Sequence, residues 1–166
     1  MKVAIIGAGS LGQSIGKGLL KNNVVSSLYL TKRNTNSIKD FNNYDEVVLT
    51  SDNTEAVINS DILIFAVQPR HFNRILESIV PHLNKDHVLI SVITGFSIAK
   101  IEAIVSEDIS IIRSMPNTAA SVAQSMTCLS PNTKGKEKIE IAKTIFNSLG
   151  VSMEIPEEQL HRAPFN

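Results

Sequence analysis

The chain has 166 residues, of which 43% are hydrophobic and 19% charged, and its sixteen basic residues balance its sixteen acidic ones. This composition predicts one compact globular domain with a sizeable core and leaves no length for a second full domain. The zero formal net charge gives no broad field to attract nucleic acid or an anionic membrane, and no apolar run approaches the roughly 20 residues of a membrane span.

Short apolar runs rich in Val and Ile alternate with helical patterns along most of the chain. Strands are expected at residues 2–6, 27–30, 46–50, 62–67, 88–92 and 109–113, and helices at 10–21, 36–41, 54–59, 72–83 and 98–105. Strict alternation of this kind requires right-handed crossovers between parallel strands, with helices on both faces of the sheet. The predicted fold class is α/β, a doubly wound parallel sheet of the Rossmann type.

After residue 117 the rhythm changes. A strand is expected at 125–129, a helix at 136–149 and a short strand at 151–155. These elements extend one sheet, so residues 1–155 are predicted to form a single dinucleotide-binding domain with extra C-terminal strands. Residues 156–166 are polar and contain two prolines, which predicts an irregular tail in which any helix begun at Glu157 ends before Pro164.

A glycine-rich turn joins the first strand to the first helix. Gly7 allows the sharp turn, Gly9 lets a pyrophosphate approach the backbone, and Gly12 allows close packing of helix on strand. With Ala8, Ser10 and Leu11, these residues are expected to hold a nicotinamide dinucleotide at the positive end of the helix. The alternative is a tight turn that binds no ligand.

The end of the second strand bears on which dinucleotide binds. An acid at this place would bind the ribose 2′-hydroxyl of NAD, but the residues are Thr31, Lys32 and Arg33. A hydroxyl and cations suit the extra 2′-phosphate of NADP, with a bidentate contact available to Arg33. NADP is therefore expected and NAD is less favoured, the alternative being an ordinary solvated basic turn.

Further loops follow the later strands at the same edge of the sheet. They contain Ala66, Val67, Gln68 and Pro69 after the fourth strand, Val92, Ile93 and Thr94 after the fifth, and Met115, Pro116, Asn117 and Thr118 after the sixth. Ligands of doubly wound sheets lie beyond the carboxyl ends of the strands, so these loops are expected to border the nicotinamide. Turns required only by topology are the alternative.

The run from Arg113 to Ala120, with Met115-Pro116-Asn117-Thr118 at its centre, and the following run from Ser125 to Ser130 are similar to a segment of the pyrroline-5-carboxylate reductase family. The stretch 66–69 also resembles the Ala-Val-Lys-Pro loop of that family. Asn53 falls where the family has an asparagine near the adenosine of NADPH, although it could instead cap the next helix. The resemblance implies NADPH-dependent reduction of Δ1-pyrroline-5-carboxylate to L-proline, with 115–118 on the substrate side.

The chain departs from the family in several places. Gln68 replaces the usual lysine, Ile93 and Thr94 replace small alanines, and the Ser-Gly-Ser-Gly-Pro segment before the family's helical dimerisation domain is missing. We therefore expect cofactor binding with little turnover from these residues alone. An NADP-dependent dehydrogenase of another small substrate, such as a 3-hydroxy acid, and a non-catalytic dinucleotide-binding protein remain alternatives, and homo-oligomer formation is left open.

No catalytic residue or metal site stands out in the sequence. His71, His82, His87 and His161 have no metal-ligand spacing and are each expected at the surface. Cys128 is the only cysteine, which excludes an intrachain disulfide. Because Met1 leads directly into a strand-like run rather than into a secretory signal, a cytoplasmic protein is expected.

Overall fold

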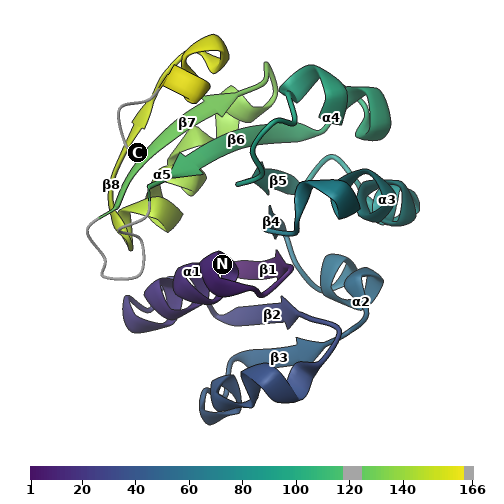
Figure 1. The fold of residues 1–166 in the computed structure, drawn as a ribbon, viewed down its shortest axis with the longest axis vertical. Coiled ribbons are helices and arrows are strands. Elements are labelled where there is room, and N and C mark those ends of the chain that lie inside the picture. Colours follow the sequence, from purple (N-terminus) through teal and green to yellow (C-terminus); the bar gives the residue numbers. More distant parts are fainter. Residues whose placement is uncertain (118–124, 163–166) are drawn as a thin grey trace.

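A computed structural model describes residues 1–117 and 125–162, which form an eight-stranded sheet with the order β3-β2-β1-β4-β5-β6-β7-β8 (Figure 1). The strands are β1 (Lys2–Ile6), β2 (Ser27–Thr31), β3 (Val47–Thr50), β4 (Ile62–Phe65), β5 (Val88–Ser91), β6 (Ser110–Pro116), β7 (Ser125–Pro131) and β8 (Gly150–Glu154). Strands β1 to β6 run parallel, whereas β7 is antiparallel to β6 and parallel to β8. The predicted doubly wound α/β sheet with extra C-terminal strands is confirmed.

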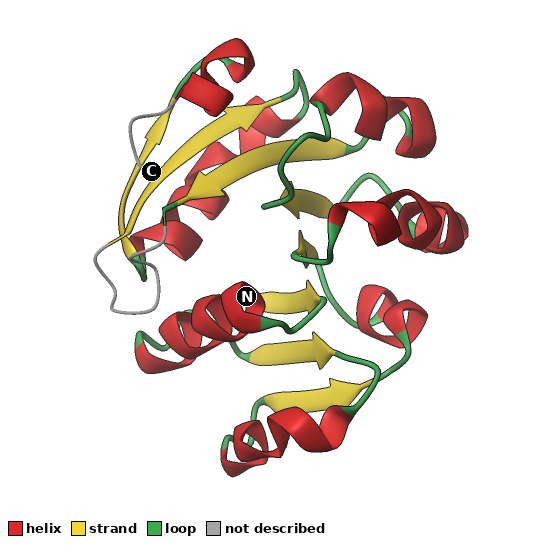
Figure 2. Cartoon of the chain, viewed as in Figure 1, coloured by secondary structure: helices red, strands yellow, loops and turns green. Residues whose placement is uncertain are grey.

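Helices cover both faces of this sheet (Figure 2). One face carries α1 (Ser10–Lys21), η1 (Thr35–Asn43) and α5 (Ile139–Asn147), and the other carries α2 (Asn53–Ile58), α3 (Pro69–Ile79) and α4 (Ile98–Val105). Successive side chains of a strand point to opposite faces, so Val3 and Ile5 pack towards α1 while Ala4 and Ile6 pack towards α2 and α3. Burial on both faces explains why the central strands are continuous apolar runs.

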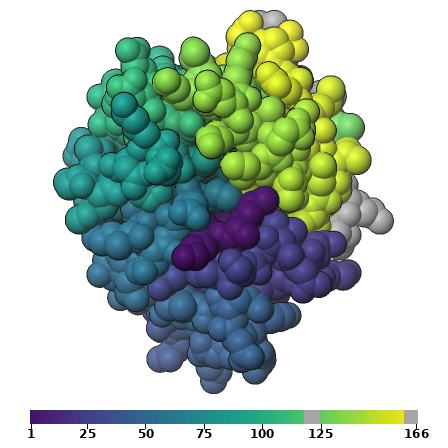
Figure 3. Space-filling view, turned by 180° about the vertical axis from the view of Figure 1, so that it is seen from behind, coloured from purple at the N-terminus to yellow at the C-terminus, as the bar shows by residue number. Residues whose placement is uncertain are grey.

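Strand β1 occupies the point where the strand order reverses, with β2 on one side and β4 on the other. Seen from behind, the first residues lie in the middle of the molecule, with later segments on either side of them (Figure 3). In doubly wound sheets the crevice for a ligand forms at this switch point, beyond the carboxyl ends of the strands.

None of the helices described in residues 1–117 and 125–162 combines the length and the apolar character needed to cross a bilayer.

The structure differs most from the expected helix bounds in three places. Helix α3 begins at Pro69, because proline suits the first turn, and ends at Ile79 before the 3₁₀ turn η2 (Val80–His82) that contains Pro81. The stretch expected at 136–149 is divided into the 3₁₀ turn η4 (Gly135–Lys138) and α5. The short polar helix expected at 36–41 is the 3₁₀ segment η1.

The C-terminal part of the domain is more regular than the sequence indicates. Strand β6 runs on to Pro116, because β7 pairs antiparallel with its whole second half. Residues after Pro156, expected to be irregular, include the 3₁₀ segment η5 (Glu157–Arg162), and Leu160 is 1% exposed in a small cluster with Cys128. Burial of the Leu160 side chain stabilises the packing of this segment against the sheet. The domain limits 1–155 and 156–166 stay a prediction.

Candidate functional site

A cavity of about 500 Å³ opens at the carboxyl edge of the sheet, beside the switch point. Loops that follow four neighbouring strands, β1 to β4, supply most of its wall, as expected when parallel strands end at the same edge. Ten residues expected from the sequence line it: Gly7, Ala8, Gly9, Thr31, Lys32, Arg33, Asn53, Ala66, Val67 and Gln68. The structure therefore brings most of the predicted cofactor residues to one hollow.

The three glycines of the first loop have different reasons to lack a side chain. Gly7 has φ of +93°, and a Cβ there would lie 2.6 Å from a methyl carbon of Val67. A Cβ on Gly12 would lie 2.7 Å from the carbonyl oxygen of Gly7, so both residues are required by the fold itself. A Cβ on Gly9 would meet no protein atom within 4 Å, although Gly9 lines the cavity. A turn without a ligand explains Gly7 and Gly12 but gives no reason for Gly9.

The amino end of α1, with its free backbone N–H groups, lies at the cavity that Gly9 lines. Its N-cap residue is Gly9, which supplies no side-chain hydrogen bond, and its first turn holds no acid. By contrast, Asp52 caps α2 and Ser97 caps α4. The first N–H groups of an α-helix have no partner inside the helix, and with the helix dipole they attract an anion. The start of α1 is therefore suited to a pyrophosphate.

Thr31 holds the glycine loop in place. Its Oγ1 accepts a hydrogen bond from the Gly7 N–H at 3.0 Å, and its carbonyl accepts one from the Ala8 N–H at 2.8 Å. Thr31 as a whole is 3% exposed. The hydroxyl expected to face a 2′-phosphate therefore already supports the turn, so Thr31 acts on a ligand chiefly through the shape of the loop.

Thr31→Val keeps the branched shape but removes the acceptor of the Gly7 N–H. We expect a loss of about 1–3 kcal/mol in the free energy of unfolding, because a buried donor is left unpaired. Thr31→Ser keeps the hydroxyl and serves as the control. Urea unfolding of the two variants measures the difference, and a Val variant as stable as the Ser variant would contradict the assignment.

Four basic side chains line the cavity, and we call them the basic wall: Lys32, Arg33, His71 and Arg74. The cavity lining contains no Asp or Glu. In the described part of the chain the ion pairs join Arg113 to Glu157 and Lys143 to Glu140, so none reaches the basic wall. A chain with zero net charge thus carries a local concentration of positive charge at this cavity.

The positive charge near the cavity affects the pKa of His71. Desolvation lowers the pKa of its imidazole below the ordinary value, and the positive charges of Arg70, Arg74 and Arg33 lower the pKa further. A guanidinium nitrogen of Arg74 lies 3.4 Å from Nδ1 of His71. These effects favour the neutral imidazole of His71 in the free protein.

The cavity is also lined by residues that the loop motifs of the sequence did not predict as part of the site. These are Ser51 after β3, and His71, Arg74, Ile75 and Ser78 on α3. The four α3 residues are spaced i, i+3, i+4 and i+7 from His71, which is the spacing of one helix face. That pattern, directly after the predicted loop 66–69, is the signal that could have identified them.

Asn53 lines the cavity as the first residue of α2. The alternative role considered for it, capping the helix, belongs instead to Asp52, whose Oδ1 accepts from the Thr54 N–H at 2.9 Å and the Glu55 N–H at 3.3 Å. The amide of Asn53 is therefore not committed to a cap.

Other expected site residues lie outside the cavity lining. Ser10, Leu11 and Gly12 continue α1, and Pro69 begins α3. Val92 and Ile93 are 8% and 5% exposed and pack in the two core clusters, while Thr94 is exposed. The larger side chain at Ile93, where the resembling family has alanine, is therefore accommodated by the core.

The substrate-side loop is described only in part. Met115 and Pro116 end β6, and Met115 packs against the cluster of Cys128 and Leu160. Asn117 follows them, and Thr118 lies outside the described residues. The binding roles of these residues and of 92–94 stay predictions.

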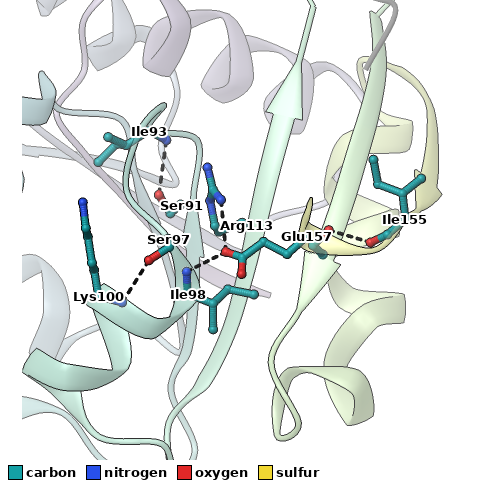
Figure 4. A network of polar contacts seen from close by, with 9 residues as sticks. Ser91, Ile93, Ser97, Ile98, Lys100, Arg113, Ile155 and Glu157 are labelled. Carbon is teal, nitrogen blue, oxygen red and sulfur yellow. Dashed lines mark hydrogen bonds and ion pairs between the residues drawn. The ribbon is translucent and has the colours of Figure 1, made fainter. Parts of the chain in front are cut away.

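A polar network connects the loop after β5 with the C-terminal segment (Figure 4). Oε2 of Glu157 accepts from the Ile98 N–H at 2.6 Å and from Nη1 of Arg113 at 3.0 Å. The carboxylate thus sits at the positive end of α4. In the loop after β5, the Ile93 N–H donates to Ser91 Oγ. This bond holds the loop against the sheet, and the bonds of Glu157 hold segment η5 there.

The described residues contain no group of three or more His, Cys, Asp or Glu able to hold a metal ion. His87, expected at the surface, is instead buried directly before the start of β5. Its Nε2 lies 3.2 Å and 3.0 Å from the carbonyl oxygens of Val57 and Ser60. Its Nδ1 accepts from the Asn84 N–H. His87 is therefore a structural residue.

The chain is similar over nearly its whole length to pyrroline-5-carboxylate reductases. "Pyrroline-5-carboxylate reductase 1" of Dictyostelium discoideum is 40% identical over 95% of this chain, which covers 31% of that relative. "Pyrroline-5-carboxylate reductase 2" of the same organism is 35% identical over 98% of this chain, which covers 60% of the relative. The chain thus spans less than two thirds of the length of each of these relatives.

Solved structures agree with the sequence relatives. The structure of a pyrroline-5-carboxylate reductase from Coxiella burnetii matches 97% of this chain with a TM-score of 0.91 and 26% identity, over 61% of its own length. The NADP-bound pyrroline carboxylate reductase of Plasmodium falciparum matches 96% of this chain with a TM-score of 0.83 and 26% identity, over 59% of its length. The resemblance expected from residues 113–130 is confirmed.

The family model described as "NADP oxidoreductase coenzyme F420-dependent" matches residues 2–95. Those residues include every part of the chain that lines the cavity. The chain therefore belongs to the NADP oxidoreductase, coenzyme F420-dependent family and is similar to the N-terminal part of pyrroline-5-carboxylate reductases.

Proposed function

We propose that the cavity binds NADPH and that this chain is the cofactor-binding part of a reductase that converts Δ1-pyrroline-5-carboxylate to L-proline. The single observation that carries the cofactor proposal is the pairing of an open approach at Gly9 with a basic wall that contains no acid. The names of the relatives and the NADP in the Plasmodium structure support the substrate and the cofactor.

The residues of the cavity fit such a dinucleotide part by part. The start of α1 would receive the pyrophosphate, and the small Ala66 and Val67 would let the rest of the cofactor run close to the backbone after β4. Arg33 would contact the 2′-phosphate as a bidentate donor. An acid that would bind the 2′-hydroxyl of NAD is replaced by Lys32 and Arg33, so NADPH is preferred over NADH.

NADPH held in this cavity would supply the hydride for reduction of the C=N bond of the cyclic imine, whose nitrogen would also gain a proton. The contribution of this chain is to orient the cofactor and to stabilise its charge. The substrate would approach beyond the carboxyl ends of β5 and β6, beside Thr94 and residues 115–117; Thr118, predicted for the same loop, lies outside the described residues. A cytoplasmic location and homo-oligomer formation also belong to the proposal, and edge strand β8 exposes Val151 and Met153, which association would cover.

The test is NADPH fluorescence titration followed by NADPH oxidation with pyrroline-5-carboxylate and with a panel of keto acids. We expect saturable NADPH binding, little turnover from the 166-residue chain, and any turnover confined to the imine. Faster oxidation with a keto acid would replace the proposal with a dehydrogenase of another substrate. Binding without any turnover, even with the rest of a homologous reductase supplied as a separate chain, would favour a non-catalytic dinucleotide-binding protein.

A further inference from the structure

One face of α3 and the loop after β2 both contribute basic residues to the lining of the cavity. His71 and Arg74 come from the first two turns of α3, and Arg33 comes from the loop after β2. A guanidinium nitrogen of Arg74 lies 3.4 Å from Nδ1 of His71, and Arg33 lines the same cavity as these two residues. The loop after β2 and helix α3 therefore both bring positive charge to this cavity.

Nothing in the described part of the chain neutralises this positive charge. The ion pairs of residues 1–117 and 125–162 lie elsewhere, and the cavity lining has no carboxylate. Arg70, on the same helix, differs because its Nε donates to Oε1 of Gln68 at 2.9 Å and its side chain is outside the lining. Like charges gathered without a counter-ion repel one another, so a bound anion would relieve the repulsion.

We propose that His71 and Arg74 of α3 form, with Arg33, a clamp for the 2′-phosphate of the dinucleotide, so that α3 shares with the end of β2 the choice of cofactor. The proposal rests on the proposed function, because it takes NADPH as the occupant of the cavity. Ile75 and Ser78, on the same helix face, would then contact the adenosine to which this phosphate is attached.

Protonation of His71 is linked to this binding. In the free protein, desolvation and then the charges of Arg70, Arg74 and Arg33 keep the pKa of His71 below its ordinary value. A phosphate carries a charge of about −1.5 to −2, which favours the imidazolium and raises that pKa when the ligand is bound. Binding therefore takes up a proton, and preference for a 2′-phosphate rises as the pH falls through the raised pKa of His71 in the complex, until the phosphate itself, with a second pKa of about 6, becomes protonated.

The clamp is tested with adenosine 2′,5′-bisphosphate, which carries the 2′-phosphate, and 5′-AMP, which lacks it. We expect Arg74→Ala to weaken binding of the bisphosphate at least about tenfold and to leave 5′-AMP binding unchanged. Arg70→Ala removes an equal charge from the same helix and is the matched control, with a much smaller effect on the bisphosphate. Equal effects of the two variants, or equal loss of both ligands in Arg74→Ala, would overturn the clamp.

Calorimetry in two buffers with different ionisation enthalpies measures the proton directly. The wild-type chain is expected to take up a proton on binding the bisphosphate but not on binding 5′-AMP, and His71→Asn is expected to lose that uptake while still folding, as circular dichroism would show. Unchanged uptake in His71→Asn would remove His71 from the clamp. A wild-type chain that binds neither NADPH nor the bisphosphate overturns the proposed function, whereas normal wild-type binding with an unaffected Arg74→Ala overturns only the clamp.

Discussion

Gly9→Ala is expected to leave the fold intact and to weaken NADPH binding at least about tenfold, which corresponds to about 1.4 kcal/mol. Gly9 has φ of −80°, a conformation that alanine adopts freely, and its new Cβ would meet no protein atom within 4 Å. The methyl group would instead occupy the space through which the pyrophosphate approaches the backbone. Fluorescence titration gives the affinity, and urea unfolding gives the stability.

Two other glycines of the same region serve as controls. Gly16→Ala places a Cβ in the buried middle of α1 at ordinary contact distances of 3.5 Å and more, so binding should be unchanged and helix stability should rise by about 0.5–1 kcal/mol. Gly7→Ala meets both a positive φ and the Val67 side chain, so it should lower stability. Wild-type affinity in Gly9→Ala, or instability like that of Gly7→Ala, would contradict the role assigned to Gly9.

Arg33→Ala is expected to remove most of the preference for NADPH over NADH. A bidentate, charge-assisted contact to phosphate is worth about 1.5–3 kcal/mol, so NADPH affinity should fall roughly 10- to 100-fold. NADH affinity should stay nearly constant, because NADH has no phosphate at this position. Parallel titrations with the two nucleotides give the ratio.

Lys39→Ala is the matched control for the loss of one positive charge. Lys39 is exposed on η1, and its side chain does not line the cavity. It should leave both affinities unchanged. If Lys39→Ala and Arg33→Ala weaken NADPH equally, general electrostatic attraction rather than a contact at Arg33 accounts for the binding.

The sheet and the glycine loop could be predicted because their causes are local in the sequence. Strands buried on both faces must be continuously apolar, as in Ile62–Phe65, and a strand that ends at a positive φ beside another loop needs glycine, as at Gly7. The limits of β6 could not be predicted in this way. They depend on antiparallel pairing with β7, and no local pattern states the direction of a partner strand.

The candidate site was predicted where residues directly follow strands and missed where a helix face completes it. Arg33 follows β2 and could be identified, whereas Arg74 becomes part of the cavity only because α3 packs beside that loop. Ile93 follows β5, and this position predicts a cofactor contact that stays a prediction. The structure adds that its side chain is 5% exposed and packs in the core, which no local pattern indicated.

The central claim is that this cavity recognises a 2′-phosphorylated dinucleotide, and the most direct measurement is a pair of equilibrium titrations of the wild-type chain with NADPH and NADH at fixed pH and salt. The account predicts saturable binding of both, with NADPH tighter by at least about tenfold because of the contacts to its extra phosphate. Equal affinity for NADPH and NADH would contradict it.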